Sequence, residues 1–246
     1  MTTQAELPFF HDVEPVSPIR DDTMSVYSLA PTQRRPAVIL CHGGPVVEGQ
    51  DPEPRDWDGF KGYSGMLAAS GLVAVTFNHR LYSDKHYPQA DQDIAFVVNQ
   101  VRQLPMVDPD KIGLWFFSGS GVLAAPWLRE PPEWLRAVAF NYPVLAAPPD
   151  WVGNAEYFNA VAAVDDSPDL PKLLIRVGSE IEFLAHTQEE FIAAAANADT
   201  DLEVVELPYA EHAFEHWPYE RNARRAADRA VDWLVDTLDD STSNAS

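Results

Sequence analysis

Short runs of apolar residues recur along the chain and indicate buried β-strands. There are six such runs, at residues 36–42, 72–78, 111–117, 137–143, 172–178 and 202–208. Each is nearly continuous in apolar residues such as Val, Ile, Leu and Phe and does not alternate with polar residues. Strands covered on both faces have this pattern, which is typical of a parallel sheet. A further run at residues 24–30 is predicted to be an antiparallel edge strand.

The segments between these runs have helical periodicity. One apolar stripe recurs at helical spacing and is made of Ile94, Val97, Val98, Val101 and Leu104. Residues 187–198 open with Thr187 and carry Glu190 three residues later, which is a capping-box pattern. Residues 219–238 repeat small and apolar residues on one face. Alternating strands and helices predict a three-layer α/β/α sandwich with a mostly parallel, doubly wound sheet.

The chain is interpreted as one folded domain, residues 21–240. Residues 1–20 form an N-terminal extension, and residues 241–246 are predicted to be a disordered tail. Two segments, 45–62 and 144–171, are longer than ordinary connections and mix Pro and Gly with aromatic residues. We expect them to be lid loops, with no large cap domain.

Composition narrows the classes of function. The chain has 38 acidic and 17 basic residues, for a formal charge of −21, so nucleic-acid binding is not expected. The single cysteine, Cys41, excludes a disulfide within the chain. The sequence has no basic, signal-like start and no run long enough to span a membrane. We therefore expect a cytoplasmic protein without membrane association.

Four polar or glycine-rich motifs each follow a predicted strand. They are residues 42–45 (HGGP), 118–121 (SGSG), 178–182 (GSEIE) and 209–214 (YAEHAF). In a parallel sheet, the carboxyl ends of the strands lie at one edge, where ligands bind. The motifs are therefore expected to meet in one crevice.

The order of these motifs resembles that of the α/β-hydrolase superfamily, in particular its dienelactone-hydrolase-like and esterase branches. The resemblance covers residues 24–238, and the order serine, acid, histidine is that of the superfamily. It implies that Ser118 is the nucleophile, Glu180 the triad acid and His212 the general base. It also implies that residues 42–45 form the oxyanion loop. We expect neither a metal nor a cofactor.

Elementary chemistry supports these residue types. A serine hydroxyl becomes a nucleophile when an imidazole accepts its proton, and a carboxylate orients that imidazole. Backbone N–H groups stabilise the oxyanion. Gly119 is predicted to supply the first, and because Pro45 has no N–H, Gly44 or Val46 supplies the second. A helix that begins at Ser118 would add a favourable dipole.

The nucleophile, the acid and the base each have an alternative residue. The superfamily pattern around the nucleophile is G-x-S-x-G, but Phe116 and Ser120 occupy the two glycine positions. Ser120 is therefore an alternative nucleophile, Glu182 an alternative acid and His216 an alternative base. The bulk of Phe116 at a crowded turn also raises the hypothesis of a protein that binds but does not react.

Aromatic residues in the two long segments are candidates for the wall of a substrate pocket. They are Trp57, Phe60, Trp151 and Phe158. The sequence therefore predicts a serine hydrolase that acts on a small carboxylic ester or lactone through a Ser-His-Glu triad and an acyl-enzyme. The alternatives are a catalytically silent small-molecule-binding protein and an acyltransferase. The expected partner is a small-molecule ester, and a homodimer is compatible with this interpretation.

Overall fold

A central sheet of eight strands organises the computed structural model, which describes residues 9, 13–151, 154–216 and 221–239. The strand order is β1-β2-β4-β3-β5-β6-β7-β8. The strands are β1 (Ile19–Arg20), β2 (Met24–Tyr27), β3 (Arg35–Cys41), β4 (Val73–Phe77), β5 (Val107–Phe117), β6 (Leu135–Asn141), β7 (Lys172–Ser179) and β8 (Leu202–Glu211). From β4 to β8 all neighbours are parallel, so the predicted mostly parallel sheet is confirmed.

The antiparallel strand predicted at residues 24–30 is correct in direction but wrong in position. β2 pairs antiparallel with β4, with Val26 opposite Val75. The short β1 then pairs antiparallel with the other side of β2. The outer strand of the sheet is therefore β1, which is too short and polar to give an apolar run in the sequence.

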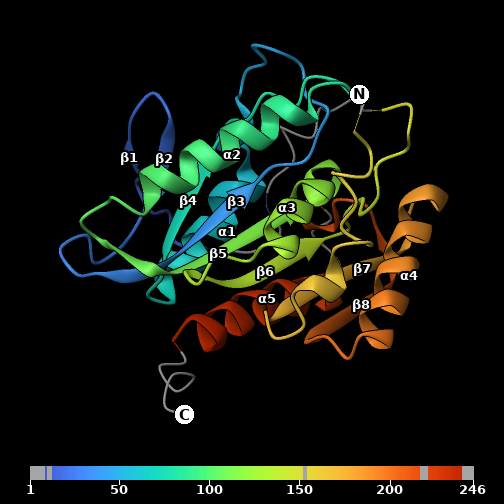
Figure 1. The fold of residues 1–246 in the computed structure, drawn as a ribbon. Helices are drawn as coiled ribbons and strands as arrows, with labels where there is room; N and C mark the ends of the chain where they lie inside the picture. Colours follow the sequence, from blue (N-terminus) through green and yellow to red (C-terminus); the bar gives the residue numbers. More distant parts are fainter. Residues whose placement is uncertain (1–8, 10–12, 152–153, 217–220, 240–246) are drawn as a thin grey trace.

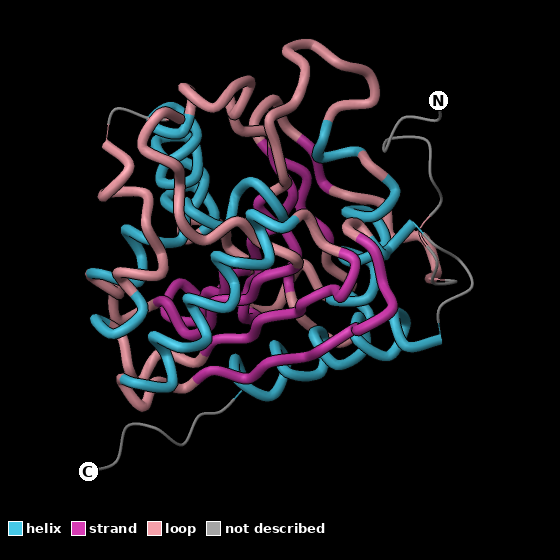
Figure 2. The backbone as a smooth tube through the Cα atoms, turned by 90° about the vertical axis from the view of Figure 1, so that its right-hand side faces the viewer, coloured by secondary structure: helices cyan, strands magenta, loops and turns pink. Residues whose placement is uncertain are grey.

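Helices cover both faces of the sheet and complete the predicted three layers (Figures 1 and 2). α1 (Asp58–Ala69) and α5 (Arg221–Asp239) lie on one face, and α2 (Tyr87–Val101), α3 (Ala125–Arg129) and α4 (Glu182–Asn197) lie on the other. Successive residues of β3 face opposite ways: Val38 contributes to the core under α1 and α5, and Ile39 to the core under α2, α3 and α4. Burial on both faces explains the continuous apolar runs.

One helix was not predicted, and another begins at a residue other than the one predicted. α1 starts at Asp58, inside the segment that was expected to be a loop to residue 62. α4 starts at Glu182, so Thr187 lies within the helix rather than at its N-cap. The Thr187 hydroxyl instead donates to the carbonyl of Leu184, 2.9 Å away, and accepts the N–H of Leu145 at 3.1 Å. That hydroxyl ties α4 to the segment after β6.

The residues before β1 that are described lie against α1. The ring of Phe9 meets that of Tyr63 edge to face, with centroids 5.1 Å apart. A Cβ atom at Gly62 would lie 2.2 Å from Phe9, and one at Gly65 would lie 2.7 Å from Val13. The two glycines therefore let this segment lie directly on the helix backbone. Among the described helices, none combines the length and apolar composition needed to cross a membrane.

Candidate active site

Ser118 follows β5, a central strand between β3 and β6, at the edge of the sheet where the parallel strands end. Its φ is 51°, in the left-handed region that residues other than glycine seldom adopt. Such strained residues cluster at functional sites. The strain turns the chain sharply from β5 into the 3₁₀ helix η3 (Ser118–Ala124) and leaves Ser118 half-buried.

Ser118, His212 and Glu180 form one chain of hydrogen bonds. The Ser118 Oγ lies 2.8 Å from Nε2 of His212. The Nδ1 of His212 lies 2.9 Å from each carboxylate oxygen of Glu180. The carboxylate sets the tautomer, because an Nδ1–H that donates to Glu180 leaves Nε2 free to accept the serine proton. The Glu180 side chain is 0% exposed and that of His212 is 27% exposed, so only the imidazole is partly open to solvent.

The three alternative residues lie elsewhere. The Ser120 hydroxyl is buried, 2.9 Å from the carbonyls of Cys41 and Phe117. Its hydrogen bonds therefore stabilise the turn that carries Ser118. Glu182 is exposed at the first residue of α4. His216 is buried in the 3₁₀ helix η5 (Phe214–His216), and no hydrogen bond of the described chain joins it to Ser118.

The oxyanion loop after β3 lies against the residue after Ser118. The N–H of Val46 donates to the carbonyl of Leu81 at 2.9 Å, so this predicted donor is already used. The N–H of Gly44 has no acceptor within the described part of the chain. Gly119 is the second residue of η3, where helical N–H groups have no partner within the helix. A Cβ at Gly119 would lie 2.1 Å from the Gly44 carbonyl oxygen, so only glycine fits there.

The helix expected after Ser118 is divided into two short elements. A 3₁₀ helix of seven residues comes first, and α3 then spans only five residues. The macrodipole of a short helix end is weak, so it would add little to the stabilisation of a negative charge beside Ser118.

Two neutral histidines support the oxyanion loop. The rings of His42 and His79 stack with centroids 3.6 Å apart. The Nδ1 of His42 lies 2.6 Å from the carbonyl of Gly43, and its Nε2 accepts the N–H of His79 at 3.1 Å. Burial lowers the pKa of His42 well below its usual value, and burial lowers the pKa of His79 to about 4. Both rings are therefore uncharged at neutral pH and act as structural residues.

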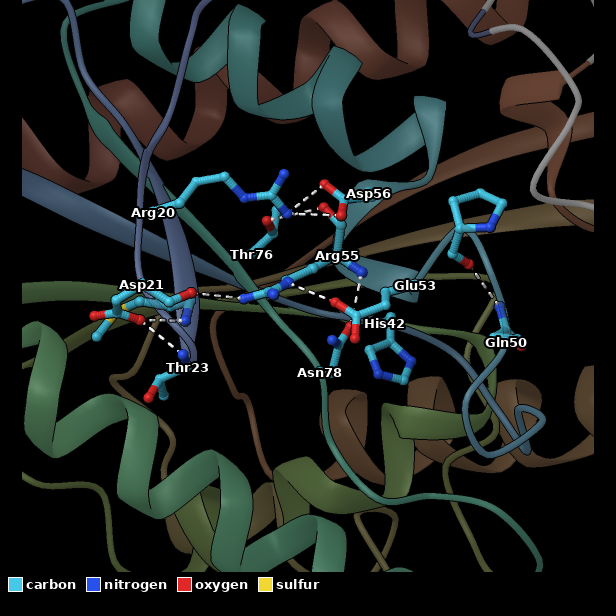
Figure 3. A network of polar contacts seen from close by, with 12 residues as sticks. Arg20, Asp21, Thr23, His42, Gln50, Glu53, Arg55, Asp56, Thr76 and Asn78 are labelled. Atoms are coloured by element: carbon cyan, nitrogen blue, oxygen red, sulfur yellow. Dashed lines mark hydrogen bonds and ion pairs between the residues drawn. The ribbon is translucent and has the colours of Figure 1, made fainter.

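An ion-pair network holds the segment between the oxyanion loop and α1 (Figure 3). The Arg20 guanidinium forms two hydrogen bonds with Asp56, at 2.7 and 2.6 Å. The backbone N–H of Arg55 donates to Asn78 at 3.0 Å, and the Arg55 carbonyl accepts a hydrogen bond from Thr76 at 3.1 Å. The network fixes the 3₁₀ helix η2 (Pro54–Asp56) against β4, and so fixes the start of α1.

A cavity of about 120 Å³ opens beside Ser118 and His212. Trp57 and Phe60, which were predicted to line a pocket, are in its wall. Trp151 and Phe158 are not, so that part of the prediction is wrong. Both pack on Tyr87, at 6.2 and 5.8 Å between ring centroids, and belong to the core on the opposite face of the sheet.

The sequence analysis missed a buried polar cluster in the cavity wall. Tyr63, Asn141 and Tyr142 each form a hydrogen bond with the carboxylate of Glu215 at 2.9 to 3.0 Å. The ring of Tyr142 also contacts that of His212, with centroids 4.4 Å apart. One signal was present in the sequence: Asn141 is a polar residue in the otherwise apolar run at 137–143.

Comparison with known proteins finds similar folds but no match by sequence. No family model and no curated protein matches the chain. Solved structures do match. A thermophilic esterase from Thermogutta terrifontis is 20% identical with a TM-score of 0.70, covering 97% of this chain and 95% of that one. An arylesterase is 16% identical with a TM-score of 0.71, covering 96% and 89%.

A peptidase is also similar. Porphyromonas gingivalis dipeptidyl peptidase 4 is 16% identical with a TM-score of 0.68, and the match covers 92% of this chain. This chain spans only 35% of the length of that protein. With the sheet order and the strand-end residues described above, these similarities establish that the chain has the α/β-hydrolase fold. The dienelactone-hydrolase branch is not singled out among the matches.

Proposed function

We propose that the protein is a serine hydrolase that cleaves small carboxylic esters or lactones. The observation that carries the proposal is the unbroken hydrogen-bond chain from the Ser118 Oγ through His212 to Glu180. The esterases and the peptidase of similar fold support hydrolysis as the reaction class. At their low sequence identity, the residues themselves carry the assignment of roles.

The contacts support an acyl-enzyme mechanism. The Ser118 Oγ attacks the carbonyl carbon while its proton passes to Nε2 of His212. The N–H groups of Gly44 and Gly119 stabilise the oxyanion, and the Glu180 carboxylate stabilises the imidazolium. The imidazolium then returns the proton to the leaving alkoxide as the C–O bond breaks. Water, deprotonated by His212, attacks the acyl-enzyme and releases the acid and Ser118.

The size of the cavity supports a small substrate. A volume of about 120 Å³ is below that of ordinary drug-sized ligand pockets. The wall includes the rings of Phe60 and Phe117, which offer apolar contacts to a short acyl chain or a small lactone ring. Phe116 lies outside this wall and stacks with Phe140 in the core under α2, α3 and α4. It therefore does not cover Ser118. The bulk of Phe116 is then no longer a reason to expect a protein that binds but does not react.

The test is hydrolysis of p-nitrophenyl acetate, paired with labelling by a fluorophosphonate probe. We expect turnover and covalent labelling of the wild type, and neither with Ser118→Ala. Ser83→Ala, a serine outside the cavity wall, is the matched control and should behave like the wild type. Equal activity of Ser118→Ala and wild type would refute the proposal. Analysis of products with added alcohol distinguishes hydrolysis from acyl transfer.

A further inference from the structure

Glu215 places a carboxylate in the wall of the cavity. Its side chain is buried, with the residue 2% exposed. Tyr63 and Asn141 donate to Oε1 at 3.0 and 2.9 Å, and the Tyr142 hydroxyl lies 3.0 Å from Oε1 and 2.9 Å from Oε2. Oε1 is therefore in contact with three donors and Oε2 with one. Oε2 keeps the capacity to accept another hydrogen bond.

The neighbours of Glu215 are arranged for an ionised carboxylate. The Asn141 amide is oriented by the indole of Trp115, which donates to its oxygen at 3.0 Å, so its NH₂ points to Glu215. The pKa values of Tyr63 and Tyr142 are raised well above their usual value by burial and by the Glu215 charge. Both phenols therefore keep their protons and act as donors to the carboxylate.

No lysine or arginine of the described residues forms an ion pair with this carboxylate. All lysines and arginines lie in the described residues, because residues 1–8, 10–12, 152–153, 217–220 and 240–246 contain none. None of them forms an ion pair with Glu215 or lines the cavity. The histidines of the wall, His212 and His216, form no ion pair with Glu215 in this part of the chain either. A buried anion without a countercharge is costly, and a cationic ligand would offset that cost.

The rest of the wall is suited to a cation. Aromatic rings surround the cavity, contributed by Trp57, Phe60, Tyr63, Phe117 and Tyr142. The faces of such rings attract ammonium groups, more strongly when water is excluded. Two buried polar atoms of wall residues, Nε1 of Trp57 and Nδ1 of His216, have no hydrogen-bond partner among the described residues.

We propose that the cavity selects substrates that carry an ammonium group, which the Glu215 carboxylate and the surrounding rings hold while Ser118 attacks the ester. This inference rests on the proposed function and names its substrate class. A substrate with a free carboxylate would meet Glu215 without any lysine or arginine in the wall, and is expected to be a poor one. The formal charge of −21 also favours the approach of cations.

The experiment compares kcat/KM for two matched ester pairs. In the first pair, acetylcholine (the acetate ester of choline) and 3,3-dimethylbutyl acetate differ in charge on the alcohol side. In the second, alanine methyl ester and methyl 2-methylpropanoate differ on the acyl side. We expect the wild type to prefer the cationic member of at least one pair, and Glu215→Gln to reduce that ratio by about tenfold. Comparing ratios between variants cancels the intrinsic reactivities of the esters.

Glu211→Gln is the matched control, because Glu211 is exposed on β8 and its change in net charge is the same. It should leave the ratio unchanged. The inference is overturned if the wild type has no cation preference in either pair. It is also overturned if the preference survives Glu215→Gln or falls equally in Glu211→Gln.

A binding measurement covers the case in which Glu215→Gln does not fold or turnover is absent. Calorimetric titration of the wild type with choline chloride and with 3,3-dimethyl-1-butanol requires neither the variant nor turnover. Tighter binding of choline supports the inference, and equal binding overturns it. Ser118-dependent hydrolysis of p-nitrophenyl acetate without any cation preference would refute this inference alone. Absence of that hydrolysis would refute the proposed function.

Discussion

Tyr142 joins the two halves of the site: its ring packs on the imidazole of His212, with centroids 4.4 Å apart, and its hydroxyl bonds to the buried carboxylate of Glu215. Its φ of 38° lies in the left-handed region, which aims the side chain between these two partners. One residue directly after β6 therefore contacts both the imidazole of His212 and the buried carboxylate in the cavity wall.

Tyr142→Phe should separate these two contributions. The ring that supports His212 is kept, but Glu215 loses a donor. We expect unfolding free energy to fall by about 1–3 kcal/mol, because a buried carboxylate becomes less well satisfied. Urea denaturation measures this loss. Tyr142→Leu removes the ring as well and should lower kcat further, whereas equal kcat for the two variants would contradict a role for the ring.

Glu180→Gln should lower kcat by about 10² to 10⁴, with little change in KM. The amide presents a donor to Nδ1 of His212, which favours the wrong tautomer and no longer stabilises the imidazolium. Steady-state kinetics with p-nitrophenyl acetate measures the effect. Glu182→Gln, two residues along at an exposed position, should keep wild-type rates. A comparable loss in both variants would count against Glu180 as the triad acid.

Ser120→Ala should reduce stability while leaving the nucleophile reactive. Its hydroxyl accepts the N–H of Phe117 at 2.9 Å and lies 2.9 Å from the Cys41 carbonyl, inside the turn that presents Ser118. Loss of these buried hydrogen bonds is expected to cost about 1–3 kcal/mol. Thermal unfolding and fluorophosphonate labelling measure the two properties. A stable variant that cannot be labelled would instead identify Ser120 as the nucleophile.

Gly119→Ala should impair both activity and folding. The added methyl group would lie 2.1 Å from the Gly44 carbonyl oxygen, so the two oxyanion segments must move apart. Overpacking of this kind costs about 1–3 kcal/mol. Gly59→Ala is the comparison, because its Cβ would meet His216 at an ordinary 3.5 Å. Urea denaturation should therefore detect a loss of stability in the first variant and little change in the second.

His79 should make the protein less stable as the pH falls from about 6.5 to 4. Burial lowers the pKa of His79 to about 4, below the 6.5 of an exposed histidine, so as the pH falls the unfolded chain binds a proton first. Stability from this residue is fully present above pH 6.5, and about 3 kcal/mol is lost between pH 7 and 4. Urea denaturation across this range should give a smaller loss for His79→Gln. An identical loss in the variant would exclude His79 as the cause.

The sheet was predictable because burial on both faces leaves a strong signal in sequence. Runs such as residues 36–42 and 172–178 correspond to β3 and β7 within a few residues. α1 was not predicted, because its sequence contains Gly59, Gly62 and Gly65, and glycine has low helix propensity. Tertiary contacts account for the glycines: the N-terminal segment packs on Gly62 and Gly65, and His216 faces Gly59.

The site was predictable where it depends on strand ends and not where it depends on packing. Ser118, Glu180 and His212 each follow a buried strand, so topology alone places them at one edge. Trp57 and Trp151 both lie in long segments rich in aromatic residues. Only the structure shows that Trp57 lines the cavity and that Trp151 packs against the core. Glu215 was missed because its partners come from α1 and from the end of β6, two segments far from it in the sequence, which leaves no local pattern.

The bare glycine face of α1 brings Phe9 into contact with Tyr63, a residue that also lines the cavity. Removing the residues before Ile19 would thus expose the backbone of α1 next to Tyr63, which donates a hydrogen bond to Glu215. α5, by contrast, runs from the edge of the sheet that carries Ser118 back to the opposite edge, so substitutions in its last described turn lie away from the cavity (Figure 1).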